Sequence, residues 1–256
     1  MLRSTPNDPT FIFDNLPLHW QMTRSEKYAF ASLVEKAAAE VAIEIGTYKG
    51  GSLQVISPQV KKVYSIDSSV ECKNTLSSKF DNVEFLTGDS KQLLPSLLDE
   101  ISRRDEPLGF VLIDGDHTFE GVRSDINAVL QYKPIRPVYV VFHDSFHPEC
   151  REGILAAQWH DCPHVHFVEV DFISGVFHFD GFDTAPPRSM YGGLAVAILS
   201  PETRTHDLVI HQSQKGLYET VLPHSCHAAS KTTLRDLIRS LKQKLRLPTM
   251  GRHVAR

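Results

Sequence analysis

The chain has 256 residues, of which 41% are hydrophobic and 23% are charged, a balance typical of a globular protein with a sizeable core. No apolar run approaches the roughly 18 residues that a membrane-spanning helix needs, and the N-terminus lacks the basic segment and apolar stretch of a signal peptide. The cysteines are far apart and form no CxxC pair, which argues against a disulfide framework or a structural zinc site. We therefore expect a cytoplasmic protein with one main domain and additions at its ends.

The net charge of −4 is unevenly distributed along the chain. Residues 228–256 hold eight Lys or Arg and one Asp, a net charge of +7, which leaves −11 for the rest. An acidic body argues against nucleic acid as the main partner, because phosphate binding needs a basic face. The basic tail is a solvated helix face or, as an alternative, contacts acidic partners or membrane lipids.

Leucine and isoleucine recur at helical spacing near the C-terminus, at Leu234, Leu237, Ile238, Leu241 and Leu245. This spacing predicts an amphipathic helix within a C-terminal extension, residues 216–256. Its apolar side is expected to dock on the main domain or on a second copy of the chain, which would make the protein a homo-oligomer.

The N-terminal residues 1–23 are rich in Pro, Asn and aromatic residues and are predicted to form an irregular arm. Within it, His19 and Trp20 either cover the acceptor of a reaction or anchor the arm by packing.

The main domain, residues 24–215, begins with a helix predicted over Arg24–Glu40. Strands and helices then alternate, with strands predicted at Val41–Ile45, Lys62–Ile66, Val83–Leu86, Phe110–Ile113 and Val138–Phe142. Helices are predicted after Ser52 and at 90–103, 118–132 and about 150–160.

The predicted strands are continuous apolar runs, as in parallel strands that helices cover on both faces. Their alternation with helices predicts a doubly wound α/β sheet with right-handed crossovers. The later runs 164–172, 175–179 and 194–199 have no long helices between them, which predicts antiparallel strands that close the sheet.

Four acidic residues each follow one of these strands: Asp67, Asp89, Asp114 and Asp144. Ligands of open α/β sheets bind along the carboxyl edge of the strands, so we expect a binding edge here. Aspartate is also a common turn residue, which is the alternative explanation.

The loop from Glu44 to Ser52 contains glycines that allow a sharp turn and close approach of a ligand. Asp67 lies 21 residues after Gly46, a spacing at which a carboxylate binds the hydroxyls of a ribose. The dinucleotide fingerprint GxGxxG is absent, because Tyr48 takes the place of its second glycine. A ligand without phosphate, such as S-adenosylmethionine, fits better than a pyrophosphate, and Glu44 is placed to orient its ammonium group. A strand–turn–helix without a ligand is the alternative.

This loop resembles the first motif of class I S-adenosylmethionine-dependent O-methyltransferases, whose catechol and caffeoyl-CoA members carry E-x-G-x-[YF]-x-G-x-S. The matching residues are Glu44, Gly46, Thr47, Tyr48, Gly50 and Ser52. Further motifs follow in order between about Val41 and Ile154. The resemblance implies a Rossmann-like, mostly parallel, seven-stranded sheet with antiparallel closing strands. It also implies that Asp67 and Ser68 bind the ribose, and that Asp89 and Ser90 bind the adenine. Asp89 is equally a candidate N-cap of the following helix, and the two roles are compatible.

The run Asp114-Gly115-Asp116-His117 and the pair His143-Asp144 are similar to a bacterial family with a D-G-D-H motif. Its relatives include macrocin- and mycinamicin-type sugar O-methyltransferases and the cephalosporin-tailoring methyltransferase. In several of them, the first Asp and a Glu-Asp pair bind magnesium. Here His143 stands in place of the Glu, which weakens the case for magnesium and leaves manganese, iron or zinc as alternatives.

A divalent cation, Mg²⁺ or Mn²⁺, held by Asp114, His143 and Asp144 is therefore one hypothesis. The alternative is that His143 and Asp144 only end a strand and line the pocket. The resemblance implies that Asp114 also faces the cofactor and that His117 is the base for the acceptor hydroxyl. A histidine that merely begins a helix is the alternative for His117.

The sequence as a whole favours O-methylation of a small hydroxylated metabolite or a sugar by S-adenosylmethionine. An NAD-dependent oxidoreductase with the same fold is one alternative, which Tyr48 and the missing fingerprint disfavour. A non-catalytic subunit that binds an adenosyl ligand is another, which the residues Asp114, His117 and Asp144 disfavour.

Overall fold

The computed structural model describes residues 16–181 and 185–228 of the chain. The chain divides into two compact units. The first comprises the residues up to Val176 together with Tyr191–Lys215, and the second comprises Phe177–Met190 together with the residues from Gly216. The amphipathic helix predicted around Leu234–Leu245 lies outside the described residues, and the domain limits and oligomer expected from the sequence stay predictions.

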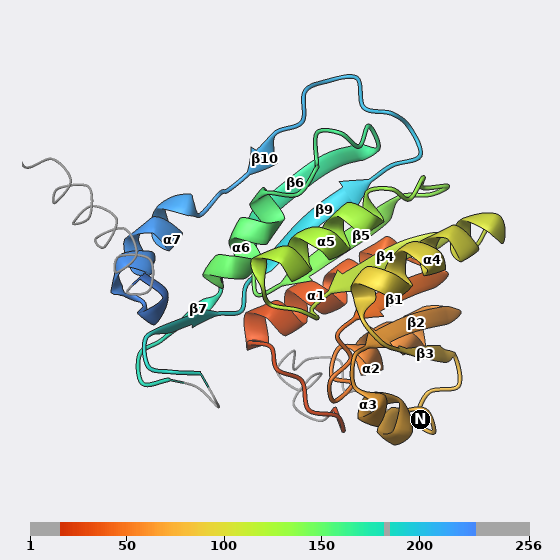
Figure 1. The fold of residues 1–256 in the computed structure, drawn as a ribbon, viewed down its shortest axis with the longest axis horizontal. Helices are drawn as coiled ribbons and strands as arrows, with labels where there is room; N and C mark the ends of the chain where they lie inside the picture. The colour runs from red at the N-terminus through yellow and green to blue at the C-terminus, as the bar shows by residue number, and fades with distance from the viewer. Residues whose placement is uncertain (1–15, 182–184, 229–256) are drawn as a thin grey trace, which may run out of the picture. The chain divides into compact units, whose positions relative to one another are not determined.

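The first unit is built on an eight-stranded sheet with the order β10-β6-β9-β5-β4-β1-β2-β3 (Figure 1). Its strands are β1 (Val41–Ile45), β2 (Lys62–Asp67), β3 (Val83–Thr87), β4 (Leu108–Ile113), β5 (Val138–His143), β6 (Val165–Ile173), β9 (Leu194–Leu199) and β10 (Ile210–His211). The first five strands pair in parallel, which confirms the doubly wound α/β sheet. Their carboxyl ends therefore lie along one edge.

The predicted number of seven strands is wrong, because β10 adds an eighth strand parallel to β6. Side chains of β6 attach the chain after β10: Glu169 accepts a hydrogen bond from Ser213 N (3.1 Å), and Asp171 accepts one from Gln214 N (3.1 Å). The expected antiparallel closing strands are present, because β9 pairs antiparallel with both β5 and β6. The strand predicted at 175–179 does not join the sheet. It is β7 (Val176–His178), which pairs with β8 (Ser189–Tyr191) in a separate two-stranded sheet.

Helices cover both faces of the large sheet. Helices α4 (Ser90–Arg103), α5 (Phe119–Val129) and α6 (Pro148–Leu155) lie over one face, where alternate strand residues such as Ile43 pack (Figure 1). Helices α1 (Arg24–Ala37) and α2 (Leu53–Ile56) pack on the other face, against residues such as Phe110. The remaining helical segments are η2 (Ser57–Gln59), α3 (Val70–Leu76), α7 (Lys215–Val221) and η3 (Leu222–His224). Within the described ranges, no helix combines the length and apolarity needed to cross a bilayer.

Three helices end earlier than the sequence predicts. Helix α6, expected at about 150–160, ends at Leu155. Helix α1 stops at Ala37, and Ala38 takes a left-handed conformation with φ of 43°. The guanidinium of Arg136 donates hydrogen bonds to the carbonyls of Ala37 (3.0 Å) and Ala38 (2.9 Å), so a distant residue caps the helix. Helix α5 stops at Val129. Helical backbone is disfavoured at Lys133, four residues later, because Lys133 precedes Pro134.

A buried ion pair fixes helix α6, which follows the end of β5. The guanidinium of Arg151 donates to Oδ1 and Oδ2 of Asp171 on β6 at 2.5 and 3.1 Å, and also to Gln212 Oε1 at 3.1 Å. Both charged side chains are almost fully buried, so the loss of either one would leave a buried charge without its counter-charge. The pair therefore connects α6 to β6 and to the segment after β10.

Candidate functional site

The predicted site residues lie at the carboxyl ends of five parallel strands. Thr47 and Tyr48 follow β1, Asp67 ends β2, Asp89 follows β3, Asp114 follows β4, and His143 and Asp144 end or follow β5. Since these strands are parallel, all of these residues are brought to one edge of the sheet.

The glycine loop, which runs from Glu44 to Ser52, lies between the ends of β2 and β4. Gly46 N donates a hydrogen bond to Ile66 O (2.9 Å), and Asp114 N donates one to Ile45 O (2.8 Å). Gly46 has φ of +88°, and a Cβ atom there would collide with the carbonyl oxygen of Asp114. Only glycine satisfies both constraints, so the loop and the end of β4 share a backbone contact.

Asp67 is bonded to the glycine loop. Its carboxylate accepts hydrogen bonds from Thr47 N (2.9 Å) and Tyr48 N (3.0 Å) through Oδ2, and from Ser69 N (2.7 Å) through Oδ1. These bonds fix the carboxylate at the strand end. Oδ2 accepts two of them, whereas Oδ1 accepts one and has capacity for one more. The side chain of Tyr48 is 52% exposed, and Ser68 is also exposed.

Glu44 is fully buried beneath the same loop. Its carboxyl accepts hydrogen bonds from Ser52 Oγ (2.6 Å) and Ser65 Oγ (3.1 Å), and Ser65 also pairs with the hydroxyl of Thr47. Burial raises the pKa of Glu44 from 4.5 to about 8, against the two serine hydrogen bonds, which favour the charged form. The side chain is therefore an uncharged support of the loop at neutral pH, directed at two serines and not at the surface.

Asp89 caps helix α4. Its Oδ1 accepts a hydrogen bond from Lys91 N (3.0 Å), as an N-cap residue does. The residue is exposed, and the next residue, Ser90, is half-buried. The N-cap role expected as one alternative is thus present.

Two histidines share two carboxylate oxygens at the ends of β4 and β5. His143 Nδ1 lies 3.1 Å from Asp114 Oδ1 and 3.7 Å from Asp144 Oδ2. His117 Nε2 lies 3.4 Å from the same Asp114 oxygen and 3.5 Å from the same Asp144 oxygen. The structure therefore brings together all four residues that the sequence singled out for chemistry.

The charges of this cluster reinforce one another. Burial favours the neutral form of Asp114, but the charge of His143 and the hydrogen bond with His117 outweigh it and hold its pKa below the usual range. Burial likewise opposes charge on His143, yet the charges of Asp114 and Asp144 raise its pKa well above 6.5. The pKa of His117 is also raised, because its hydrogen bond to Asp114 and the charge of Asp144 outweigh burial.

Asp144 is held in an unusual backbone conformation. It has φ of 56°, which is left-handed and uncommon for a residue other than glycine. Gly192 N donates a hydrogen bond to Asp144 Oδ1, and Phe146 N donates one to Gly192 O (2.9 Å). The turn before β9 thus fixes the side chain, and residues held in this way often belong to functional sites.

The sequence did not predict that Glu26 belongs to this cluster. Its carboxylate closes a capping box with Thr23 at the start of α1, and its Oε1 accepts a hydrogen bond from Gly193 N. The same Oε1 lies 3.7 Å from His143 Nε2, and the residue is 1% exposed. The pattern Thr-x-x-Glu is readable as a capping box, but nothing in it indicates that the Glu faces a buried histidine.

Asp114, His143 and Asp144 also have the arrangement of a metal site. One ligand atom from each lies within 4.8 Å of the other two. Ligands at 2.0–2.1 Å around an octahedral ion are about 3 Å apart, so small shifts would bring these three atoms to coordinating positions. Two oxygens and one imidazole nitrogen suit Mn²⁺ or another transition ion better than Mg²⁺. The donor set therefore fits a divalent cation.

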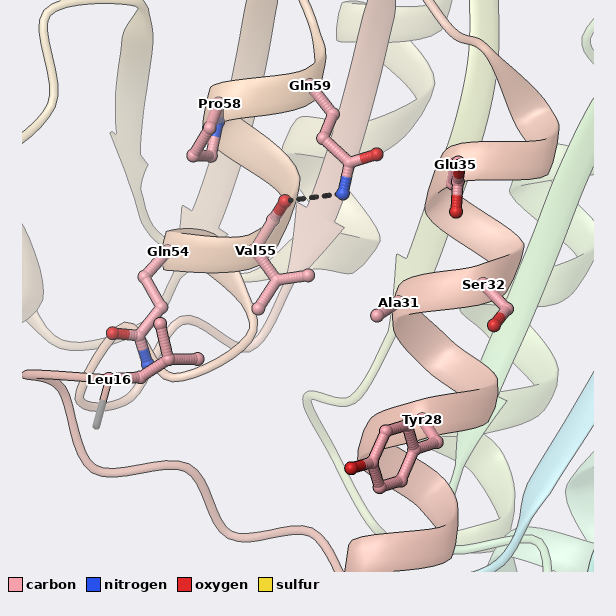
Figure 2. Close-up of a pocket in the computed structure, with 9 residues that line it drawn as sticks. All are labelled: Leu16, Tyr28, Ala31, Ser32, Glu35, Gln54, Val55, Pro58 and Gln59. Carbon is pink, nitrogen blue, oxygen red and sulfur yellow. Dashed lines mark hydrogen bonds between the residues drawn. The ribbon is translucent and has the colours of Figure 1, made fainter. Parts of the chain in front are cut away.

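A separate pocket of about 390 Å³ lies between α1 and the segment formed by α2 and η2 (Figure 2). Tyr28 and Ala31 of α1 line one side of it and Val55 the other, where Gln59 Nε2 donates a hydrogen bond to Val55 O (3.3 Å). None of the acids or histidines of the strand-end cluster lines this pocket, so we assign it no part in the chemistry.

The buried carboxyl of Glu44 makes stability depend on pH. Between pH 4.5 and about 8 the folded protein keeps a proton that the unfolded chain releases, so this contribution is full below pH 4.5 and is lost as the pH rises to 8. Glu44→Gln cannot ionise, and the serine hydroxyls can turn to accept from its amide. We predict that this variant removes a slope of up to about 1.4 kcal/mol per pH unit from the unfolding free energy.

Denaturant unfolding from pH 5 to 8 tests this, with Glu35→Gln on the exposed side of α1 as the control. The control is expected to follow the unaltered protein. An identical slope in Glu44→Gln and in the unaltered protein would show that Glu44 is ionised in the fold.

Comparison with known proteins agrees with this arrangement. Residues 43–145 match a family model described as a methyltransferase domain, and this segment runs from β1 to the residue after Asp144. No curated protein sequence matches the chain. A cofactor-bound protein from MTB has a similar structure, with 18% identity and a TM-score of 0.50 over 73% of this chain and 85% of that chain.

Two further solved structures are similar. The O-methyltransferase TomG from Streptomyces achromogenes, in complex with SAM, has 14% identity and a TM-score of 0.50 over 70% of this chain and 81% of its own. An O-methyltransferase from Bacillus cereus, in complex with SAH, has 17% identity and a TM-score of 0.49 over 73% and 86%. The chain thus contains a segment that matches a methyltransferase domain, within a Rossmann-like methyltransferase fold.

Proposed function

We propose that the protein is an S-adenosylmethionine-dependent O-methyltransferase that acts on a small hydroxylated metabolite or a sugar. The observation that carries this proposal is the backbone contact between Gly46 and Asp114. Through it the loop proposed to bind the cofactor adjoins the cluster of Asp114, His117 and Asp144. A cofactor methyl group and an acceptor hydroxyl need this proximity in order to react.

The cofactor is proposed to lie along the edge from Asp67 to Asp114. Asp67 Oδ1 has capacity left for a ribose hydroxyl, and the carboxylate is fixed by Thr47 N and Tyr48 N. Asp89 and Ser90, at the start of α4, are proposed to bind the adenine amino group. The other loop residues proposed to contact or shape the cofactor site are Glu44, Gly46, Gly50, Ser52 and Ser68.

The proposed reaction is an in-line displacement. The acceptor oxygen forms a bond to the methyl carbon, the bond from that carbon to sulfur breaks, and sulfur leaves with the electron pair as a neutral thioether. The acceptor hydroxyl loses its proton, which we assign to the neutral imidazole of His117 at Nδ1, because Nε2 faces Asp114 and Asp144 at 3.4 and 3.5 Å and carries a hydrogen toward them. The two carboxylates would stabilise the resulting imidazolium.

A divalent cation is part of the proposal, with Asp114, His143 and Asp144 as the residues that would hold it. When bound, such an ion supplies a Lewis acid that makes the acceptor hydroxyl more acidic. Asp114 and Asp144 would then contact both the ion and His117. Because the acceptor hydroxyl would be more acidic, its deprotonation would depend less on His117.

The alternative functions have less support. An NAD-dependent oxidoreductase would need room for a pyrophosphate at the loop, where Tyr48 stands in a left-handed conformation with φ of 48°. A non-catalytic binding subunit would have no use for two histidines placed on shared carboxylates.

We predict that the protein binds S-adenosylhomocysteine and not NAD, and that Asp67→Asn weakens this binding about 10–100-fold. The reason is the loss of a charged hydrogen-bond acceptor, worth about 1.5–3 kcal/mol, where about 1.4 kcal/mol corresponds to tenfold. Isothermal titration calorimetry measures both ligands. Asp81→Asn, which makes the same charge change at an exposed residue, is the control and should bind normally. Tight NAD binding without S-adenosylhomocysteine binding would contradict the proposed function.

We also predict that His117→Ala lowers turnover about 10²–10⁴-fold after chelation of divalent ions, the range expected for loss of a general base. With Mn²⁺ present the loss should be smaller, and cofactor affinity should be unchanged in both conditions. Turnover is measured as release of S-adenosylhomocysteine with an acceptor found by screening hydroxylated small molecules and sugars.

His160→Ala, at an exposed histidine, is the control for this variant. If His117→Ala turns over at the normal rate after chelation, the base role is wrong. If the variant loses affinity for the cofactor, His117 supports the fold of the site instead.

A further inference from the structure

The two ring nitrogens of His143 face different carboxylates. Nδ1 lies 3.1 Å from Asp114 Oδ1 and 3.7 Å from Asp144 Oδ2, on the side where the cation is proposed. Nε2 is buried and makes no hydrogen bond to any residue that the structure describes. The carboxylate that faces this nitrogen is that of Glu26, whose Oε1 is 3.7 Å away. The orientation of the ring therefore depends on the interactions that each of the two nitrogens makes.

Glu26 is held in place without any help from His143. Thr23 N donates a hydrogen bond to Oε2 at 2.6 Å, and Gly193 N donates one to Oε1. The first donor belongs to the start of α1 and the second to the turn before β9, so two separate parts of the first unit fix the carboxylate. A carboxylate oxygen can accept two hydrogen bonds, so Oε1 still has capacity for one more.

The distance between Glu26 Oε1 and His143 Nε2 exceeds the length of a hydrogen bond by less than 1 Å. A buried N–H group without an acceptor is destabilising, more so when charge is involved, so a shorter distance between Glu26 Oε1 and His143 Nε2 is favourable. A ring that donates from Nε2 to a carboxylate is fixed in orientation and presents Nδ1 on its opposite side. Metal-binding histidines commonly use this arrangement, because it fixes the tautomer and raises the basicity of the nitrogen that binds the ion.

We propose that Glu26 is a positioning residue that accepts the Nε2–H of His143 and thereby turns Nδ1 toward the place between Asp114 and Asp144. Helix α1 then contributes to the chemical site through this one side chain, although it lies in the sequence before every motif of the methyltransferase domain. The consequence for ion affinity rests on the divalent cation of the proposed function, whereas the hydrogen bond itself does not.

The test compares Glu26→Gln with Thr23→Ala in the full chain. Glutamine keeps the size of the side chain and one acceptor oxygen, but it has no charge and too few acceptors for Thr23 N, Gly193 N and His143 together. Thr23→Ala removes the hydroxyl that accepts from Glu26 N at 3.3 Å and leaves the carboxylate intact. It therefore reports on weakened helix capping alone.

The first readout is the affinity for Mn²⁺ alone, measured by calorimetry. We expect Glu26→Gln to bind Mn²⁺ about 10–100-fold more weakly, the usual cost of losing the partner of a ligand histidine, and Thr23→Ala to bind it normally. The second readout is the Nε2–H proton of His143 in NMR spectra of the metal-free protein. It should be shifted downfield and protected from exchange in the unaltered protein and in Thr23→Ala, and it should be lost in Glu26→Gln.

Unchanged Mn²⁺ affinity together with an unchanged Nε2–H signal in Glu26→Gln would overturn the proposal. If the unaltered protein does not bind Mn²⁺, the divalent cation is removed from the proposed function, and the Nε2–H signal decides the role of Glu26 by itself. If Glu26→Gln does not fold, the unaltered protein still provides a test. Its Nε2–H proton should show a nuclear Overhauser effect to the γ protons of Glu26, and the absence of that effect would overturn the proposal.

Discussion

One carboxylate, that of Asp114, connects the two halves of the site. Its Oδ1 lies 3.1 Å from His143 Nδ1 and 3.4 Å from His117 Nε2. Its backbone carbonyl lies against Gly46, where no side chain fits. The position of the acid at the end of β4 thus determines both where the glycine loop lies and where the two imidazoles lie. A displacement of this strand end would move the proposed cofactor site and the proposed base together.

The charges around Asp114 would allow the proposed site to use a base, a cation or both. The carboxylates of Glu26, Asp114 and Asp144 surround His143, so the imidazolium form is stabilised there. A divalent cation at Asp114, His143 and Asp144 would replace the proton on Nδ1 and would satisfy the same carboxylates. With His143 where the resemblance leads one to expect a glutamate, the proposed cation site would have a mixed set of oxygen and nitrogen ligands. Such a set would disfavour Mg²⁺ and would make the orientation of one ring important.

The sequence predicted most of the fold because buried parallel strands have a clear local signature. The apolar runs placed β1 to β5 within two residues of their ends, and the acids that follow them mark the edge of the sheet. Strand β10 was not predicted, because two residues show no periodicity and the following segment is held by hydrogen bonds that its backbone donates to distant acids. The end of α1 depends on Arg136, which no local pattern near Ala37 indicates.

The site residues likewise divide into those with a local sequence signature and those placed by contacts with distant residues. Asp114, His117, His143 and Asp144 could be singled out because they stand at strand ends in recognisable motifs. Glu26 could not, because its contact with Gly193 spans 167 residues and its capping pattern is common at exposed helix ends. The glycine pair before β9 likewise shows its purpose only in the fold, where Gly192 holds the carboxylate of Asp144.

The most direct test of the central claim is a crystal structure of the full chain with S-adenosylhomocysteine. The proposed function predicts that the ribose hydroxyls bind Asp67 and that the cofactor sulfur lies on the side of the glycine loop that faces Asp114 and His117. Binding of the adenosyl group elsewhere, or with its sulfur directed away from Asp114 and His117, would contradict the proposed site and its chemistry.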